Sequence, residues 1–157
     1  MSLDGFDIAL LNLVQENNLL TSEQLADSVG LSATSCQRRL KRLRANGSIE
    51  ADVSIISGQL AGAHVTLIVL VTLEREQHDL LDAFKRKITK HPEVTQCYYV
   101  TGDADFILVV KAKSMEAYGY FTERAFFGDA NVKGFTTYAT MQVVKNSTKV
   151  HLPEPTR

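Results

Sequence analysis

The chain has 157 residues, of which 45% are hydrophobic and 22% are charged, and its formal net charge is -1. This length and composition suit one ordinary domain or two small ones and exclude disorder as the default state. A near-neutral chain is not expected to coat nucleic acid indiscriminately, although it can carry a local basic patch. No apolar run approaches the roughly 18 residues that cross a bilayer, and no secretory signal is evident, so we expect a cytoplasmic protein without a membrane partner.

Cysteine and histidine spacing gives no sign of a metal site. Cys36 and Cys97 lie far apart and outside any C-x-x-C spacing, so neither a disulfide framework nor a zinc site is indicated. The four histidines are scattered, and no two of them share a helical face at the spacing that metal ligands need. We therefore predict free thiols, no metal ion and no cofactor.

The first part of the chain has the pattern of three helices. Apolar residues at a spacing of four predict an amphipathic helix over about residues 4–16. Thr21 and Gln24 have the spacing of a capping box that begins a short second helix. Gly30 suits the left-handed residue that ends this helix, and Ser32 can cap a third one after a tight turn. This order of elements is typical of a helix-turn-helix unit.

The third helix, within residues 32–47, carries a concentrated basic patch. Five basic residues occupy seven positions there: Arg38, Arg39, Lys41, Arg42 and Arg44. Residues placed at 100° intervals form an apolar stripe that should pack on the first two helices. The members of this stripe are Ala33, Cys36, Leu40 and Leu43. The opposite face carries Thr34, Ser35, Arg38, Lys41 and Arg42, and it is flanked by Arg39 and Arg44.

This division between two faces favours entry into the major groove of DNA. Small hydroxyl residues at the helix start can approach base edges, Arg38 can make a bidentate contact to guanine, and later basic residues can neutralise phosphates. A solvated charged face is the alternative, but the tight turn and the two capped helices before it favour DNA binding. The predicted DNA-binding residues are Thr34, Ser35, Gln37, Arg38, Arg39, Lys41 and Arg42.

The rest of the chain predicts a second domain. Alternating apolar residues indicate a short strand or wing over 49–55, and a glycine-containing linker places the boundary near residue 60, giving domains 1–60 and 61–157. Strands are expected over 65–73, 94–100, 106–112 and 132–144, with helices after the first and third of them. The fold class is therefore α+β: a winged helix-turn-helix domain followed by a ferredoxin-like βαββαβ sandwich. The tail after Lys145 is expected to be mobile or to dock on a partner subunit.

Three stretches together carry a family resemblance: LDGFDIALLNLVQENN, LSATSCQRRLKRLRANGSI and VTGDADF. They resemble the Lrp/AsnC family (leucine-responsive regulatory protein and asparagine-synthesis regulator, or feast/famine) of bacterial and archaeal transcription regulators, over residues 3 to about 145. The resemblance implies an N-terminal domain that binds double-stranded DNA and a C-terminal domain that dimerises, assembles into octamers or related homo-oligomers, and binds an amino acid. No converging set of nucleophile, base or metal ligands indicates an enzyme.

The resemblance also implies an effector site. In the family the matching Gly-Asp-x-Asp turn borders an amino-acid pocket between subunits, which implies contacts at Gly102, Asp103, Asp105, Met115, Tyr138, Ala139 and Thr140. Turn amides can bind a carboxylate and an aspartate can accept from an ammonium group, although such aspartates are ordinarily turn formers. Met115 and Tyr138 are equally compatible with a core or an interface.

Two questions about the effector stay open in the sequence. Ala139-Thr140 is smaller and more polar than the aliphatic pair of relatives, so a polar, small or aromatic amino acid fits as well as leucine. The alternative function is an effector-independent architectural protein that organises DNA by oligomerising.

Overall fold

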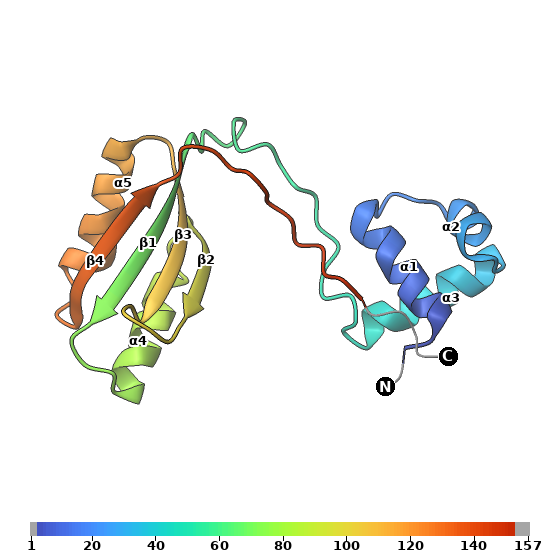
Figure 1. Cartoon of the computed structure of the whole chain (residues 1–157), viewed down its shortest axis with the longest axis horizontal. Coiled ribbons are helices and arrows are strands. Elements are labelled where there is room, and N and C mark those ends of the chain that lie inside the picture. The colour runs from blue at the N-terminus through green and yellow to red at the C-terminus, as the bar shows by residue number, and fades with distance from the viewer. Residues whose placement is uncertain (1–2, 153–157) are drawn as a thin grey trace. The chain divides into compact units, whose positions relative to one another are not determined.

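The computed structural model describes residues 3–152, and its contacts divide the chain into two compact units (Figure 1). The helical unit groups the residues up to Ile55 with those from Lys145 onward, and the sandwich unit is Ile56–Val144. The division expected at residue 60 assigns the returning C-terminal segment to the second domain, whereas its contacts lie with the first. No described helix is long and apolar enough to cross a bilayer.

Three helices form the helical unit: α1 (Gly5–Glu16), α2 (Ser22–Val29) and α3 (Ala33–Ala45). Each begins at a side-chain cap, because the first backbone N–H groups of a helix lack carbonyl partners. Thr21 and Gln24 cap each other at α2, as predicted, and Asp4 and Asp7 do the same at α1. Gly30 ends α2 with φ of 73°, a left-handed conformation that glycine adopts without a steric penalty.

The core of the helical unit is small and aliphatic. Its buried apolar residues are Leu10, Leu11, Leu25, Cys36, Leu40 and Leu43. The stripe predicted for α3 is confirmed, since three of its four members are buried in this core and Ala33 is half-buried.

The strand or wing expected over 49–55 is wrong for this chain. Ile49 packs against the helical core, and its N–H donates to the Leu43 carbonyl. Residues 50–57 after it form no helix or strand. A segment with alternating apolar and polar residues forms a strand only where a neighbouring strand offers free backbone groups. In this segment the Asp52 side chain accepts hydrogen bonds from Arg44 and Asn18.

The sandwich unit has the predicted βαββαβ order. Its elements are β1 (Val65–Leu73), α4 (His78–Ile88), β2 (Val94–Tyr99), β3 (Phe106–Ala112), α5 (Met115–Thr122) with a π-helical continuation η1 (Glu123–Phe127), and β4 (Val132–Ala139). The strands form one antiparallel sheet in the order β2-β3-β1-β4. Buried residues alternate along the two central strands and pack with those of α4, α5 and η1, so the helices cover one face of the sheet.

The last strand ends earlier than predicted. β4 stops at Ala139, opposite Leu67 of β1, instead of at residue 144. The N–H and Oγ1 of Thr140 both donate to the Thr66 carbonyl, at 3.0 and 2.8 Å. The tail expected to be mobile or docked on a partner subunit instead contacts α1 of its own chain as far as residue 152, and its two prolines lie outside the described residues.

Candidate nucleic-acid interface and effector site

The outer face of α3 is the candidate nucleic-acid interface. Thr34, Gln37, Arg38, Lys41 and Arg42 are exposed, whereas Ser35 is half-buried and its N–H donates to the Ser32 hydroxyl that caps the helix. The exposed residues thus occupy one side of a helix whose other side is buried. Such a helix can present side chains to a groove without disturbing the core that holds it.

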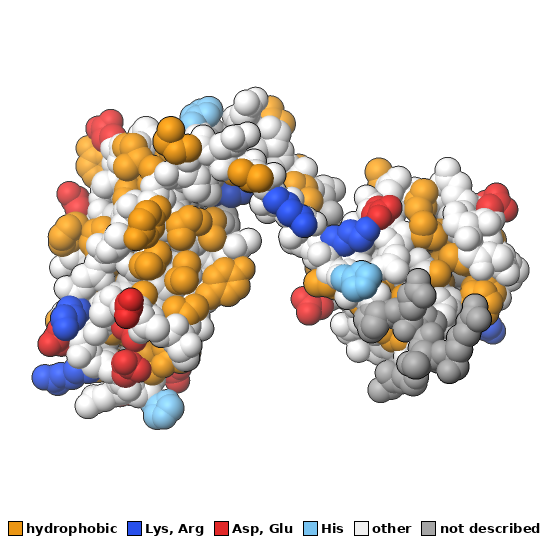
Figure 2. All heavy atoms as spheres, viewed as in Figure 1, with side chains coloured by type: hydrophobic (Ala, Val, Ile, Leu, Met, Phe, Trp, Pro, Cys, Tyr) orange, Lys and Arg blue, Asp and Glu red, His pale blue; other side chains and the backbone are white. Residues whose placement is uncertain are grey.

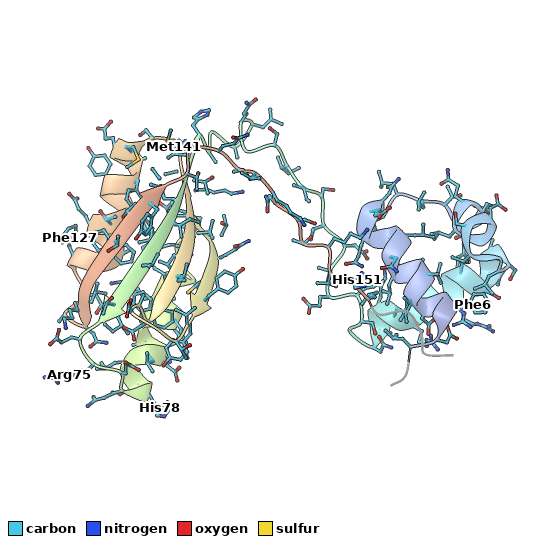
Figure 3. The ribbon with its side chains drawn as sticks, in the orientation of Figure 1. Phe6, Arg75, His78, Phe127, Met141 and His151 are labelled. Atoms are coloured by element: carbon cyan, nitrogen blue, oxygen red, sulfur yellow. The ribbon has the colours of Figure 1, made fainter. Side chains whose placement is uncertain are left out.

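Two of the predicted DNA-binding arginines are engaged within the unit. Arg39 Nη1 donates to carboxylates of Asp4 and Asp7, both at 2.8 Å, and Arg42 Nη2 donates to Asp7 at 2.5 Å. The guanidinium of Arg39 also lies 5.5 Å from the ring centroid of Phe6, a residue labelled in Figure 3. These contacts hold α3 against the start of α1.

Asp7 is the centre of this network, and it is only 1% exposed. A buried carboxylate needs charged or hydrogen-bonded partners, which the two arginines supply. At Asp4 the N–H of Asp7, and next the Arg39 guanidinium, lower the carboxyl pKa. Sequence reasoning missed both aspartates, although two acids three residues apart at a helix start have the same spacing as the capping box of α2.

The remaining basic residues of α3 separate into paired and unpaired groups. Arg44 Nε donates to Asp52 at 2.7 Å, which raises the pKa of Arg44 and lowers that of Asp52. Arg38 and Lys41 form no ion pair with any described residue. Their charge is therefore available to a ligand outside the unit.

The predicted effector residues form two separate groups within one chain. The first is the β2–β3 turn, where Gly102 has φ of 131° and Asp103 is exposed. Asp105 Oδ2 accepts from the Leu73 N–H at 2.6 Å, and its N–H donates to the Val71 carbonyl. Among the described residues, the N–H groups of Gly102 and Asp103 have no partner, so the turn offers two free donors.

The second group lies at the opposite end of the sheet. Tyr138 and Ala139 are exposed at the end of β4, where Ala139 pairs with Leu67, and Thr140 follows them. Met115 begins α5 and is 52% exposed. Since the first group is bonded to Leu73 and the second lies beside Leu67, the two are about 20 Å apart along β1. One chain does not bring them into one pocket.

The face of the sheet away from the helices is apolar. Two rows of residues cross it: Tyr98, Ile107, Leu70 and Thr136 form the first, and Gln96, Val109, Ile68 and Tyr138 form the second. Figure 2 shows hydrophobic side chains gathered over this sheet. No described element of the chain covers them, and an apolar face of this kind marks an interaction surface.

A three-helix unit with a basic third helix, joined to a ferredoxin-like sandwich, defines a class of two-domain DNA-binding regulator. Residues 3–44 match the AsnC-type helix-turn-helix domain, and residues 66–150 match the Lrp/AsnC ligand binding domain. The chain belongs to the Lrp/AsnC family and is a DNA-binding transcription regulator. The relatives that it resembles are described as transcriptional regulators.

Relatives and solved structures agree with this assignment. An uncharacterized HTH-type transcriptional regulator of Sinorhizobium fredii is 60% identical over 92% of this chain and 86% of its own length. The glutamate uptake regulatory protein of Zymomonas mobilis is 31% identical over 97% of this chain and 92% of its own. A transcriptional regulator of Neisseria meningitidis in complex with L-Met has a TM-score of 0.89 and 27% identity, with 96% and 97% of the two chains covered.

Proposed function

We propose that α3 reads the major groove of an operator through its outer face, in a cytoplasmic regulator. The observation that carries this proposal is the division of α3 into a buried stripe and an outer face on which Arg38 and Lys41 are unpaired. Arg38, nearer the helix start, is the base reader, and Lys41 contacts phosphate. Arg39 mainly positions α3 on α1, and the half-exposed Arg42 combines its bond to Asp7 with a phosphate contact.

Replacing Arg38 and Lys41 separately tests this division of roles. We expect Arg38→Ala to weaken specific binding by about 1 to 3 kcal/mol and to relax sequence preference, because a bidentate guanine contact is lost. We expect Lys41→Ala to weaken binding to all sequences equally and to reduce the salt slope by about 1. Fluorescence anisotropy with operator and random DNA at several salt concentrations measures both effects.

Arg86→Ala is the matched control, since Arg86 is exposed on α4 and has no ion-pair partner among the described residues. It should leave operator affinity nearly unchanged. Equal losses on operator and random DNA for Arg38→Ala would assign Arg38 to phosphate contact, and wild-type affinity in both α3 variants would contradict the proposed interface.

We further propose that an amino acid binds between two sandwich units. Each chain has one half of the site at each end of its sheet, and its apolar sheet face needs a partner. A two-fold axis in the interface and perpendicular to the strands would place the turn of one copy beside the β4 end of the other. The free N–H groups of Gly102 and Asp103 would then bind the effector carboxylate, and Met115 and Tyr138 of the second copy would line its side-chain slot. Such dimers would assemble further, into octamers or related forms.

A thermal-shift screen with the common amino acids tests for the effector. A ligand that binds only the folded protein stabilises it by about 2.7 kcal/mol at a hundredfold excess over its Kd, so one amino acid should raise the Tm. Light scattering on the same samples gives the mass of the assembly. A screen in which no amino acid shifts the Tm would favour the architectural alternative.

A further inference from the structure

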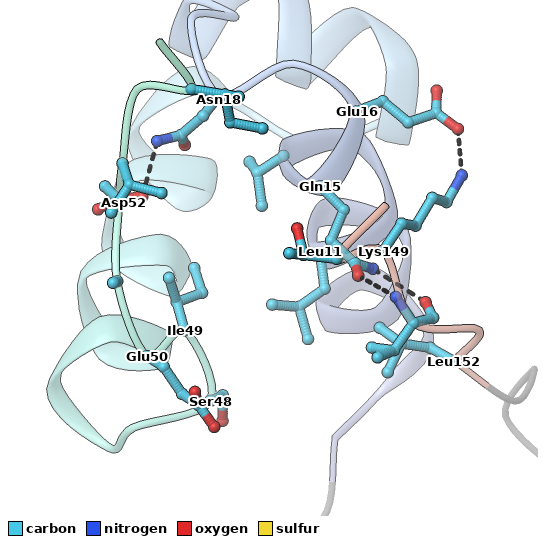
Figure 4. A pocket seen from close by; sticks show the side chains of 16 residues that line it. Leu11, Gln15, Glu16, Asn18, Ser48, Ile49, Glu50, Asp52, Lys149 and Leu152 are labelled. Atoms are coloured by element: carbon cyan, nitrogen blue, oxygen red, sulfur yellow. Dashed lines mark hydrogen bonds and ion pairs between the residues drawn. The ribbon is translucent and has the colours of Figure 1, made fainter. Parts of the chain in front are cut away.

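The C-terminal segment lies against α1 through an unusual backbone contact. The side-chain amide of Gln15 pairs with both backbone groups of Val150: the Val150 N–H donates to Oε1 at 2.8 Å, and Nε2 donates to the Val150 carbonyl at 3.3 Å (Figure 4). An amide has one acceptor and one donor group, so it can satisfy an extended residue as a neighbouring strand would. Gln15 therefore binds the backbone of this segment.

Side chains on both sides of Val150 add contacts. The ammonium group of Lys149 donates to the Glu16 carboxylate and lowers its pKa. Leu152 is half-buried and packs against the core of the helical unit, near Leu11. The tail thus forms one wall of a groove of about 530 Å³, whose other walls are α1 and residues 48–55 (Figure 4).

The same segment is fixed at its other end. Thr140 is bonded twice to the Thr66 carbonyl, directly after β4 ends at Ala139. The residues between Thr140 and Lys149 form no helix or strand. The chain therefore leaves the helical unit after Ile55 and returns to it at Lys145, which gives two covalent connections between the units.

We propose that residues 147–152 are an intramolecular ligand of the helix-turn-helix domain, and that they link the end of β4 to the domain that reads DNA. Covalent attachment gives this short segment a high effective concentration at its groove, so a few contacts are enough to hold it. A change at Tyr138 and Ala139 on effector binding would alter the tension or position of the tail. This second step rests on the proposed effector site, whereas docking of the tail does not.

Hydrogen exchange of the Val150 amide tests docking without DNA or amino acid. In the full-length chain we expect this amide to exchange at least about tenfold more slowly than in an unstructured peptide, because it is bonded to Gln15. Gln15→Ala should abolish the protection, and the control Gln59→Ala, in an exposed position of the linker, should keep it. Exchange at the unstructured rate in the unmodified chain, or unchanged protection in Gln15→Ala, would overturn the proposal.

Mixed assemblies decide whether the tail docks on its own chain. Isotope-labelled Gln15→Ala chains are co-assembled with unlabelled chains that end at Asn146 and keep Gln15. A tail that docks on its own chain remains unprotected at Val150, because its own groove lacks Gln15. Restored protection would mean that the tail binds the groove of a second copy and would overturn docking within one chain.

The linkage step is tested with the same truncated chain and with Leu152→Ala. Neither change touches α3, so operator affinity without effector should stay within about threefold of wild type. The ratio of affinities with and without the amino acid found by the thermal-shift screen should fall towards 1. An unchanged ratio would overturn the linkage step, while a screen without any hit would contradict the effector proposal and leave the exchange result to decide docking.

Discussion

The two units are stabilised in different ways. The helical unit has six buried apolar residues in its described core and relies on capping boxes and on a buried aspartate bonded to two arginines. The sandwich unit has fifteen buried residues and a group of contacting aromatic rings. A small domain that leaves one face of a helix exposed has little apolar surface to bury, so polar contacts must fix its geometry. The sandwich unit buries its larger core on one face of the sheet, and the other face is not covered by any described element of the chain.

The largest effect is expected from removing a ring at the centre of the sandwich core. Phe121 is fully buried and contacts His91, Tyr118 and Phe126, with ring centroids 5.4 to 5.9 Å away. Phe121→Ala should lower the free energy of unfolding of this unit by about 3 to 5 kcal/mol, because it leaves a cavity. All five tyrosines of the chain lie in the sandwich unit and there is no tryptophan, so the tyrosine band of the near-UV circular dichroism spectrum follows this unit alone.

Phe127→Ala provides the matched control for that experiment. Phe127, labelled in Figure 3, is 74% exposed, and among the described residues its ring contacts that of Phe135 alone. We expect a loss of about 1 kcal/mol or less. Equal destabilisation by both substitutions, or an unchanged tyrosine transition in Phe121→Ala, would contradict the claim that the sandwich unit is stabilised mainly by its apolar core.

An intermediate effect is expected in the helical unit from Asp7→Ala. The substitution leaves Arg42 without a described partner and Arg39 with Asp4 alone, and it also removes half of the α1 capping box. Because the two arginines are partly exposed, we expect a loss of about 1 to 3 kcal/mol and not the larger cost of an isolated buried charge. Far-UV circular dichroism should show an earlier helical transition, while the tyrosine transition of the sandwich stays unchanged.

Asp82→Ala is the control for Asp7→Ala, since it removes an exposed partner of Lys85 on α4. Exposed pairs contribute little, so its effect should be about 0.5 kcal/mol or less. A helical transition that does not move in Asp7→Ala would show that the apolar core alone holds α3 in place.

Sequence patterns predicted features that depend on neighbouring residues, and they failed for features that depend on contacts between residues far apart in the sequence. The capping box at Thr21, the stop at Gly30 and the buried stripe of α3 depend on neighbours within a few residues, and each is present. The strand expected over 49–55 is absent because a strand requires a partner, and local alternation cannot show whether one exists. The pairing of Arg39 with Asp4 and Asp7 was likewise hidden, because it joins residues more than thirty positions apart.

The candidate effector site shows the same limit more clearly. Family resemblance named residues at both ends of the sheet, but only the strand register shows that the turn at Gly102 and the end of β4 at Tyr138 lie far apart in one chain. The outer face of α3 is different, since its residues are neighbours on one helix and a helical projection predicts their common side. A site within one element can be predicted from spacing, whereas a site built from two copies of a chain cannot.

The smallest effect on stability is expected from acidification, and it should differ between the two units. Burial beside Phe121 lowers the pKa of His91, with Arg124 and Lys87 contributing and Glu93 opposing. The unfolded chain therefore binds a proton at His91 from about pH 6.5, before the folded chain does, so sandwich stability falls as the pH drops through the folded pKa. In the helical unit the depressed pKa values belong to Asp4, Glu16 and Asp52, whose contribution is complete above about pH 5. Between pH 7 and 5 the tyrosine transition should move to slightly lower temperature while the helical transition stays in place. His91→Gln should remove that shift, and a shift that persists in this variant would assign the dependence to another group.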